Sequence, residues 1–223
     1  MRLRDLALLV AFAASLVASA PASRGQAAAP AAPARDDIVN TLSKFETGPD
    51  LDLAALKQAV LEKSRSRSRK EPEPSKRPPV VPDILNLPTF NFAIQFDVDT
   101  PVILPESYET VGRLADALVN APLLPYTFLI VGHSQSTGKR EANVILSQRR
   151  ADAIRDVLIN TFKISSKRLQ SLGLGEEQFI DQAHPTSSVN QQIQVVTIGK
   201  LPEEAAPPAA TPAAKKSAKK KKK

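Results

Sequence analysis

The segment from Gly132 to Ser136 holds residues whose types and spacing could do chemistry. It reads Gly-His-Ser-Gln-Ser after a buried apolar run, which is where a serine hydrolase places its nucleophile in the pattern G-x-S-x-G. Aspartates that precede His184 would even supply the Ser–Asp–His order of such an enzyme. The second glycine is serine here, however, and the next helix begins only after Gly138. Residues 89–200 are also too few for a hydrolase sheet, so we predict that the protein is not an enzyme.

Other reactive side chains are scarce. The chain has no cysteine, no tryptophan and only 2 histidines. This composition leaves no disulfide, no thiolate metal site and no cysteine for lipoprotein acylation, and we expect no cofactor. Arg149 and Arg150 are neighbours on a predicted helix, so their side chains point about 100° apart. We predict that one of them faces a pocket and the other faces solvent.

The net charge of +7 is concentrated at one end of the chain. Residues 215–223 supply seven lysines, whereas residues 83–198 carry 9 Lys or Arg against 12 Asp or Glu. A nucleic-acid-binding fold carries its basic residues on the folded surface, so nucleic acid is not an expected partner. Residues 201–223 are predicted to be a disordered Ala/Pro/Lys tail. It would contact anionic lipid or lipopolysaccharide, or would act only as a solubilising end.

The first residues carry an export signal. Two arginines precede an apolar run from Leu6 to Ala20, and small residues follow. This order is typical of a secretory signal peptide, predicted here as residues 1–22, with Ala27 as a second candidate for the cleavage site. A membrane span needs about 20 apolar residues, so an uncleaved anchor is the weaker alternative. We therefore expect an exported protein, located in the periplasm and associated with the outer membrane if a partner or the charged tail holds it there.

The next residues carry weaker signals. Within residues 36–63, two short apolar stripes separated by Gly48 indicate a weakly helical segment, whose second helix would be capped by Asp50 or Asp52. Isolated helices of this length are marginal in water, so they would dock on the folded domain or on a partner, or fray. Residues 64–88 combine an Arg/Ser run with prolines, and we predict a basic, solvated linker stiffened by proline.

Sustained patterning occupies residues 89–200, enough for one ordinary core. Alternating apolar residues predict strands at 90–96 and 193–198, and apolar segments predict strands at 126–131 and 169–174. Two helices are predicted between the first three strands, one opening at the sequence Pro-Glu-Ser and a longer one after the glycine-bounded loop. The order is βαβαββ or βαβαβ, an α/β fold with helices packed on a mixed sheet.

This region resembles the OmpA-like C-terminal domain family. Residues 94–105 are similar to the family's opening F-x-x-[DN]-S-A-x-[IL]-x-P. Residues 132–151 resemble G-H-T-D-x-x-G followed by N-x-x-L-S-x-x-R-A, without an insertion. Further on, residues 168–176 are similar to R-L-x-x-x-G-x-G-E, and residues 190–193 are less similar to N-R-R-V. A resemblance of this length is far more specific than any one of its motifs.

The resemblance implies a periplasmic domain that binds the diaminopimelate of the peptidoglycan stem peptide. It places Arg150 where the family's ligand-binding arginine lies, suited to a bidentate pair with the ligand's carboxylate. The family's aspartate is Gln135 here, which accepts a hydrogen bond but carries no charge. The family's arginine pair is likewise replaced, by Gln191-Gln192. The peptidoglycan-binding residues implied are Arg150, Gln135, Asn143 and Ser134.

Two functions follow from this combination of a kept arginine and lost charges. In the first, the protein is a non-enzymatic envelope protein that associates noncovalently with peptidoglycan. In the alternative, the domain is a degenerate scaffold for protein–protein interaction that no longer binds peptidoglycan. The alternative stays open because loss of one charged partner at a buried site costs about 2–5 kcal/mol, and a fold alone does not establish a function.

Overall fold

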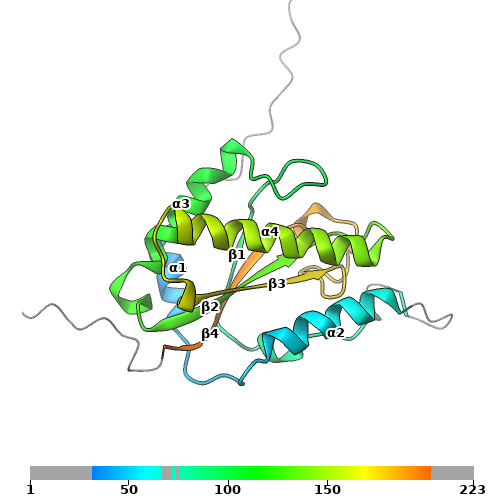
Figure 1. Cartoon of the computed structure of the whole chain (residues 1–223), viewed down its shortest axis with the longest axis horizontal. Coiled ribbons are helices and arrows are strands. Elements are labelled where there is room, and N and C mark those ends of the chain that lie inside the picture. Colours follow the sequence, from blue (N-terminus) through cyan, green and yellow to red (C-terminus); the bar gives the residue numbers. More distant parts are fainter. Residues whose placement is uncertain (1–31, 67–71, 74–75, 202–223) are drawn as a thin grey trace, which may run out of the picture.

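The computed structural model describes residues 32–66, 72–73 and 76–201 (Figure 1). The signal peptide predicted at residues 1–22, and the predicted tail from residue 202 onward, lie outside the described residues. Among the helices that are described, none combines the length and the apolar character that a membrane crossing requires.

The helices and strands follow the predicted order. The helices are α1 (Arg35–Leu42), α2 (Leu53–Arg65), α3 (Tyr108–Leu118) and α4 (Arg140–Asn160), and the strands are β1 (Thr89–Phe92), β2 (Tyr126–His133), β3 (Leu169–Gly175) and β4 (Ile193–Lys200). From β1 onward the order is therefore βαβαββ, the first of the two predicted orders, and the predicted α/β fold class is confirmed.

The strands form one mixed sheet in the order β1-β4-β2-β3. β2 and β3 are parallel, as a connection through α4 allows, whereas β4 is antiparallel to both β1 and β2. β1 ends at Phe92 rather than at Phe96, because the chain turns sharply where the amide of Ile94 bonds to the carbonyl of Phe92. Phe96 forms only an isolated bridge with Ile103.

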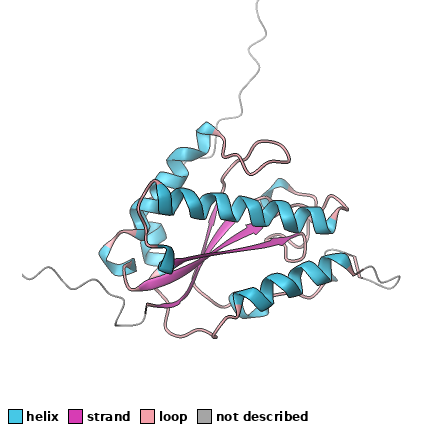
Figure 2. Cartoon of the chain, in the orientation of Figure 1, coloured by secondary structure: helices cyan, strands magenta, loops and turns pink. Residues whose placement is uncertain are grey.

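Both faces of the sheet are covered, which explains the continuous apolar run in β2. Phe128 and Ile130 belong to a core with residues of α1, α3 and α4, whereas Leu129 and Val131 belong to a second core on the opposite face. Figures 1 and 2 show α4 on one side of the sheet and α2 on the other. Alternate residues of one strand therefore serve two separate cores.

Residues 36–88 contribute to both cores: α1 joins the first core, and α2 and part of the predicted linker join the second. Both short helices dock on the domain, α1 through Ile38, Val39 and Leu42 and α2 through Val60. Residues expected to lie in a solvated linker also pack, since Val81 and Ile84 are buried against the sheet. The physical reason is that the second face of the sheet is apolar, and burying a Val or Ile side chain stabilises by about 1.5–3 kcal/mol.

Asp52 caps α2, as the sequence suggested for Asp50 or Asp52. Its Oδ1 accepts hydrogen bonds from the amides of Ala54 and Ala55, each at 3.0 Å. We expect Asp52→Ala to lower the free energy of unfolding by about 1 kcal/mol, because two amides of the first turn lose their partner. Chemical denaturation followed by circular dichroism measures this. Asp50→Ala, at an exposed position outside the helix, is the matched control, and an equal loss for both variants would contradict the assignment.

α4 lies unusually close to β2 and β3 because the strands carry glycine where they meet it. A Cβ atom on Gly132 would lie 2.2 Å from the carbonyl oxygen of Ser147, and one on Gly173 would lie 2.3 Å from the amide nitrogen of Gln148. Neither distance is compatible with a side chain. These glycines therefore set how closely α4 packs against the sheet. This distance also sets the position of Arg150, about one turn further along α4.

Candidate functional site

Arg150 is the central residue of the site. It lies on the buried face of α4, and the residue is only 9% exposed. Its Nε donates to the carbonyl of Thr100 at 3.0 Å and its Nη2 to the carbonyl of Asp97 at 3.3 Å. The guanidinium carbon also lies 4.9 Å from the centre of the Phe96 ring, in a cation–π contact. The loop after β1 thus holds the side chain in one orientation.

Arg150 has no carboxylate partner among the described residues. None forms an ion pair with it, and the hydrogen bonds to carbonyls use only part of its N–H groups. Burial lowers the pKa of Arg150, while the charge of nearby Asp99 raises it. A buried guanidinium without a charged partner is costly. It is therefore well suited to receive a carboxylate from outside the chain.

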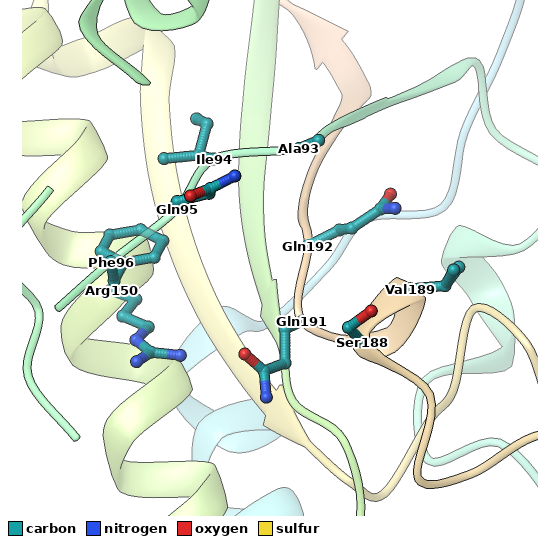
Figure 3. Close-up of a pocket in the computed structure, with 9 residues that line it drawn as sticks. All are labelled: Ala93, Ile94, Gln95, Phe96, Arg150, Ser188, Val189, Gln191 and Gln192. Atoms are coloured by element: carbon teal, nitrogen blue, oxygen red, sulfur yellow. The ribbon is translucent and has the colours of Figure 1, made fainter. Parts of the chain in front are cut away.

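The guanidinium faces a cavity of about 400 Å³. Figure 3 shows Arg150 and Phe96 on one side of it and Gln192, Ser188 and Val189 on the other. The full lining is Ala93, Ile94, Gln95, Phe96, Arg150, Ser188, Val189, Gln191 and Gln192. The cavity lies between the end of β1, α4 and the loop that leads into β4, and among the described residues Arg150 alone brings a charge to its lining.

Asn190 shapes the far wall of this cavity. The residue is fully buried, and its side-chain nitrogen donates to the carbonyls of Asp181 and His184 at 3.1 and 2.9 Å. Its side-chain oxygen accepts from the amide of Asp181 at 2.8 Å. These hydrogen bonds hold together the two ends of the loop before β4. Ser188 and Gln191, on either side of Asn190, are thereby presented to the cavity.

Asn143 lies about two turns before Arg150 on α4 and has a different set of contacts. Its amide nitrogen donates to Oε2 of Glu176 at 2.6 Å, and its oxygen accepts from the hydroxyl of Thr137 at 2.9 Å. Asn143 does not line the cavity of Arg150 but a neighbouring one of about 550 Å³, which Asp99 and Arg149 also line. In this structure it fixes the loop between β2 and α4.

Ser134 and Gln135 begin that loop. The hydroxyl oxygen of Ser134 is buried and has no hydrogen-bond partner among the described residues. Its amide donates to the carbonyl of Gly175 at 3.0 Å, which anchors the backbone. Gln135 is half-buried. Neither residue lines the cavity of Arg150, so the structure places Arg150 in the cavity and the other three predicted residues around the adjoining loop.

His133 has a structural environment. Its Nδ1 lies 2.9 Å from the carbonyl oxygen of Gln178 and Nε2 lies 3.4 Å from the side-chain oxygen of Gln194. Since the hydroxyl of Ser134 has no partner, the described residues contain no Ser–His pair at this position. The other histidine, His184, pairs with Asp181 at 2.9 Å on the surface. The residues that could form a hydrolase triad are therefore not assembled.

Burial lowers the pKa of His133, and this predicts a pH dependence of stability. The unfolded chain takes up the proton near pH 6.5 but the folded chain only at lower pH. The stability that the folded protein gains by keeping His133 neutral is therefore fully present above about pH 6.5. It is lost as the pH falls towards the folded-state pKa. We expect the urea midpoint to fall between about pH 7.5 and about pH 5, and His133→Gln to reduce that fall. His184→Gln is the control, and an unchanged pH dependence in His133→Gln would rule out this origin.

Sequence reasoning named Arg150 and a replaced residue pair that line the cavity, but gave no cavity role to the remaining lining residues. The replaced pair Gln191-Gln192 does line it, and these residues were visible in the motif. Phe96 was visible as part of an apolar strand and of the motif at residues 94–105, but neither gave it a role in the cavity. Ser188 and Val189 gave no signal, because they reach the cavity through a loop whose path depends on the buried Asn190.

This fold and this cavity define a class: an α/β domain with a buried arginine that faces a cavity. Residues 95–193 match the OmpA family. This part of the chain is an OmpA family domain, as the resemblance in the sequence indicated. The match includes Phe96, Arg150 and Gln192, but not the first two helices.

Two curated relatives share this region. Outer membrane porin F of Pseudomonas aeruginosa is 35% identical over 85 residues, which cover 38% of this chain and 24% of the porin. The peptidoglycan-associated lipoprotein of Brucella melitensis is 30% identical over 105 residues, which cover 47% of this chain and 61% of the lipoprotein. The chain thus matches less than two thirds of each relative. A solved peptidoglycan-associated lipoprotein of Burkholderia pseudomallei overlaps with a TM-score of 0.38 at 21% identity, covering 58% of this chain and 96% of that one.

Proposed function

We propose that this protein associates noncovalently with peptidoglycan, and that Arg150 binds a carboxylate of the stem peptide, that of diaminopimelate. The observation that carries the proposal is the buried guanidinium, which has no carboxylate partner among the described residues and faces a cavity. A carboxylate is the group that a guanidinium fork binds most strongly and with a defined orientation. The OmpA family domain and the name of the Brucella lipoprotein support peptidoglycan as the source of that carboxylate.

The proposal assigns separate roles to the four predicted residues. Arg150 holds the ligand directly. Asn143 positions the loop between β2 and α4 through Glu176 and Thr137. Ser134 and Gln135 start that loop, and the unpartnered hydroxyl of Ser134 is a polar group that a ligand or an ordered water would satisfy. Export to the periplasm, and contact of the lysine tail with anionic lipid or lipopolysaccharide, belong to the same proposal.

Cosedimentation with purified diaminopimelate-type peptidoglycan tests the proposal. The full chain would be compared with a chain that ends at Leu201, at low and moderate salt, with free diaminopimelate as competitor. We expect the shortened chain to keep binding at moderate salt and to be released by the competitor. Contacts between exposed charges weaken with salt. Binding that disappears with the tail or with salt would therefore be electrostatic attachment, and would favour the scaffold alternative.

A further inference from the structure

We infer that the cavity of Arg150 takes a carboxylate whose neighbouring nitrogen is acylated and therefore uncharged, in preference to a free zwitterion. In peptidoglycan this chemistry corresponds to a cross-linked stem peptide, in which the side-chain amine of diaminopimelate has become an amide. The inference rests on the proposed function and names the ligand class of the same cavity.

The charges that line the cavity are unbalanced. Arg150 supplies a positive charge, and the other polar side chains of the lining are the neutral Gln95, Ser188, Gln191 and Gln192. A ligand carboxylate therefore finds a charged partner, whereas a ligand ammonium finds only neutral dipoles. A free ammonium would also lie in the same cavity as a guanidinium, and placing like charges together costs several kcal/mol in a partly buried site.

The carboxylates around the cavity are occupied or face elsewhere. Glu176 and Glu177, both buried at the end of β3, are paired with Arg77 and Arg140. Asp99 is exposed and lines the neighbouring cavity rather than this one. The carboxylate of Asp97 is also exposed and accepts from the amide of Val98 at 2.9 Å.

The lining suits an amide better than an ammonium. An acylated nitrogen keeps one N–H donor and gains a carbonyl acceptor, and it carries no charge. Each glutamine amide offers both an acceptor oxygen and N–H donors, and the hydroxyl of Ser188 offers both roles. Gln95, Gln191 and Gln192 use none of their side-chain groups in a hydrogen bond with another described residue, so these groups are available to a ligand.

Calorimetric titration of the full chain with two synthetic ligands tests the inference. The first is the tripeptide L-Ala-γ-D-Glu-meso-diaminopimelate, and the second is the same tripeptide with the diaminopimelate side-chain amine acetylated. We expect the acetylated tripeptide to bind at least about 10-fold more tightly, since removal of one like-charge contact of 1.4 kcal/mol gives this factor. Gln192→Glu, which adds a carboxylate on the wall opposite Arg150, should reduce or reverse the preference. Asp99→Asn should leave it in place.

The outcomes separate this inference from the proposed function. Equal affinity, or tighter binding of the free amine, would overturn the inference and leave peptidoglycan binding standing. A marked change of the preference in Asp99→Asn, in either direction, would overturn it as well, because Asp99 and not the cavity lining alone would then distinguish the amine from the amide. If neither tripeptide binds and the chain does not sediment with peptidoglycan, the proposed function fails too.

Discussion

Replacement of Arg150 by alanine is expected to weaken peptidoglycan binding by roughly 30-fold to 5,000-fold, which corresponds to about 2–5 kcal/mol. The loss is large because the ligand carboxylate would enter a partly buried cavity to which the described part of the chain contributes no other cation. Arg150→Lys should recover only part of the affinity, since lysine keeps the charge but not the planar fork. Cosedimentation over a range of peptidoglycan concentrations measures the change.

The control residue for this experiment is Arg149, which directly precedes Arg150 on α4. Arg149 is exposed and does not line the cavity, so Arg149→Ala removes a positive charge from α4 without touching the guanidinium site. We expect its binding to change by less than about threefold, as for a charge at the rim of an interface. Because Arg150 also holds the carbonyls of Asp97 and Thr100, thermal unfolding of each variant shows whether the fold persists. Equal losses in both variants, with the fold intact, would contradict a specific role for Arg150.

Removal of the carboxylate of Glu177 is expected to be the most destabilising of the substitutions considered, at about 3–5 kcal/mol for Glu177→Ala. Glu177 and Arg140 form a bidentate pair, with distances of 2.7 and 2.5 Å, and their side chains are only 0% and 10% exposed. The variant leaves a buried guanidinium that also donates to the carbonyl of Ser66 at 3.1 Å, at the end of α2. Urea denaturation followed by circular dichroism measures the loss.

A neighbouring ion pair on the surface provides the control for Glu177→Ala. Glu141 contacts Arg65 at 2.7 Å, but these side chains are 44% and 56% exposed. Exposed ion pairs contribute about 0–1 kcal/mol, so Glu141→Ala should have a small effect. A small effect of Glu177→Ala as well would show that the buried pair adds little net stability. Replacement of both Arg140 and Glu177 by apolar residues should be milder than loss of Glu177 alone, because the guanidinium that loses its buried carboxylate in the single variant is then removed as well.

The order of elements and the central arginine could be predicted from the sequence alone. Apolar periodicity identifies β2 and β4 because each strand must bury at least one face, whatever the rest of the chain does. The cap could be narrowed to Asp50 or Asp52 because a capping interaction involves only neighbours in sequence. Arg150 could be recognised because motifs along the chain resemble one family, and residues 95–193 are indeed a domain of that family.

The buried face of α4 was decided by tertiary structure. Hydropathy alone would place the apolar Ile145 on the buried face, but Ile145 is 38% exposed, and the buried face begins instead with Asn143, Val144 and Ser147. Polar side chains are buried here because they bond to other segments, as Asn143 does to Glu176. Hydropathy cannot show this, because it contains no information about partners distant in sequence.

Tertiary structure also decided the roles of Gly173 and of the segment before the OmpA family domain. Gly173 lies within β3, where the backbone of α4 leaves no room for a side chain, a close approach that the residue type alone does not reveal. Residues 36–88 left docking or fraying of the two helices open and suggested a spacer after them, yet α1 joins the first core, and α2 and part of the predicted spacer complete the core on the second face of the sheet. A short helix or a proline-rich segment has too little local stability to be predicted. It becomes ordered only because the rest of the chain offers an apolar surface for it to cover.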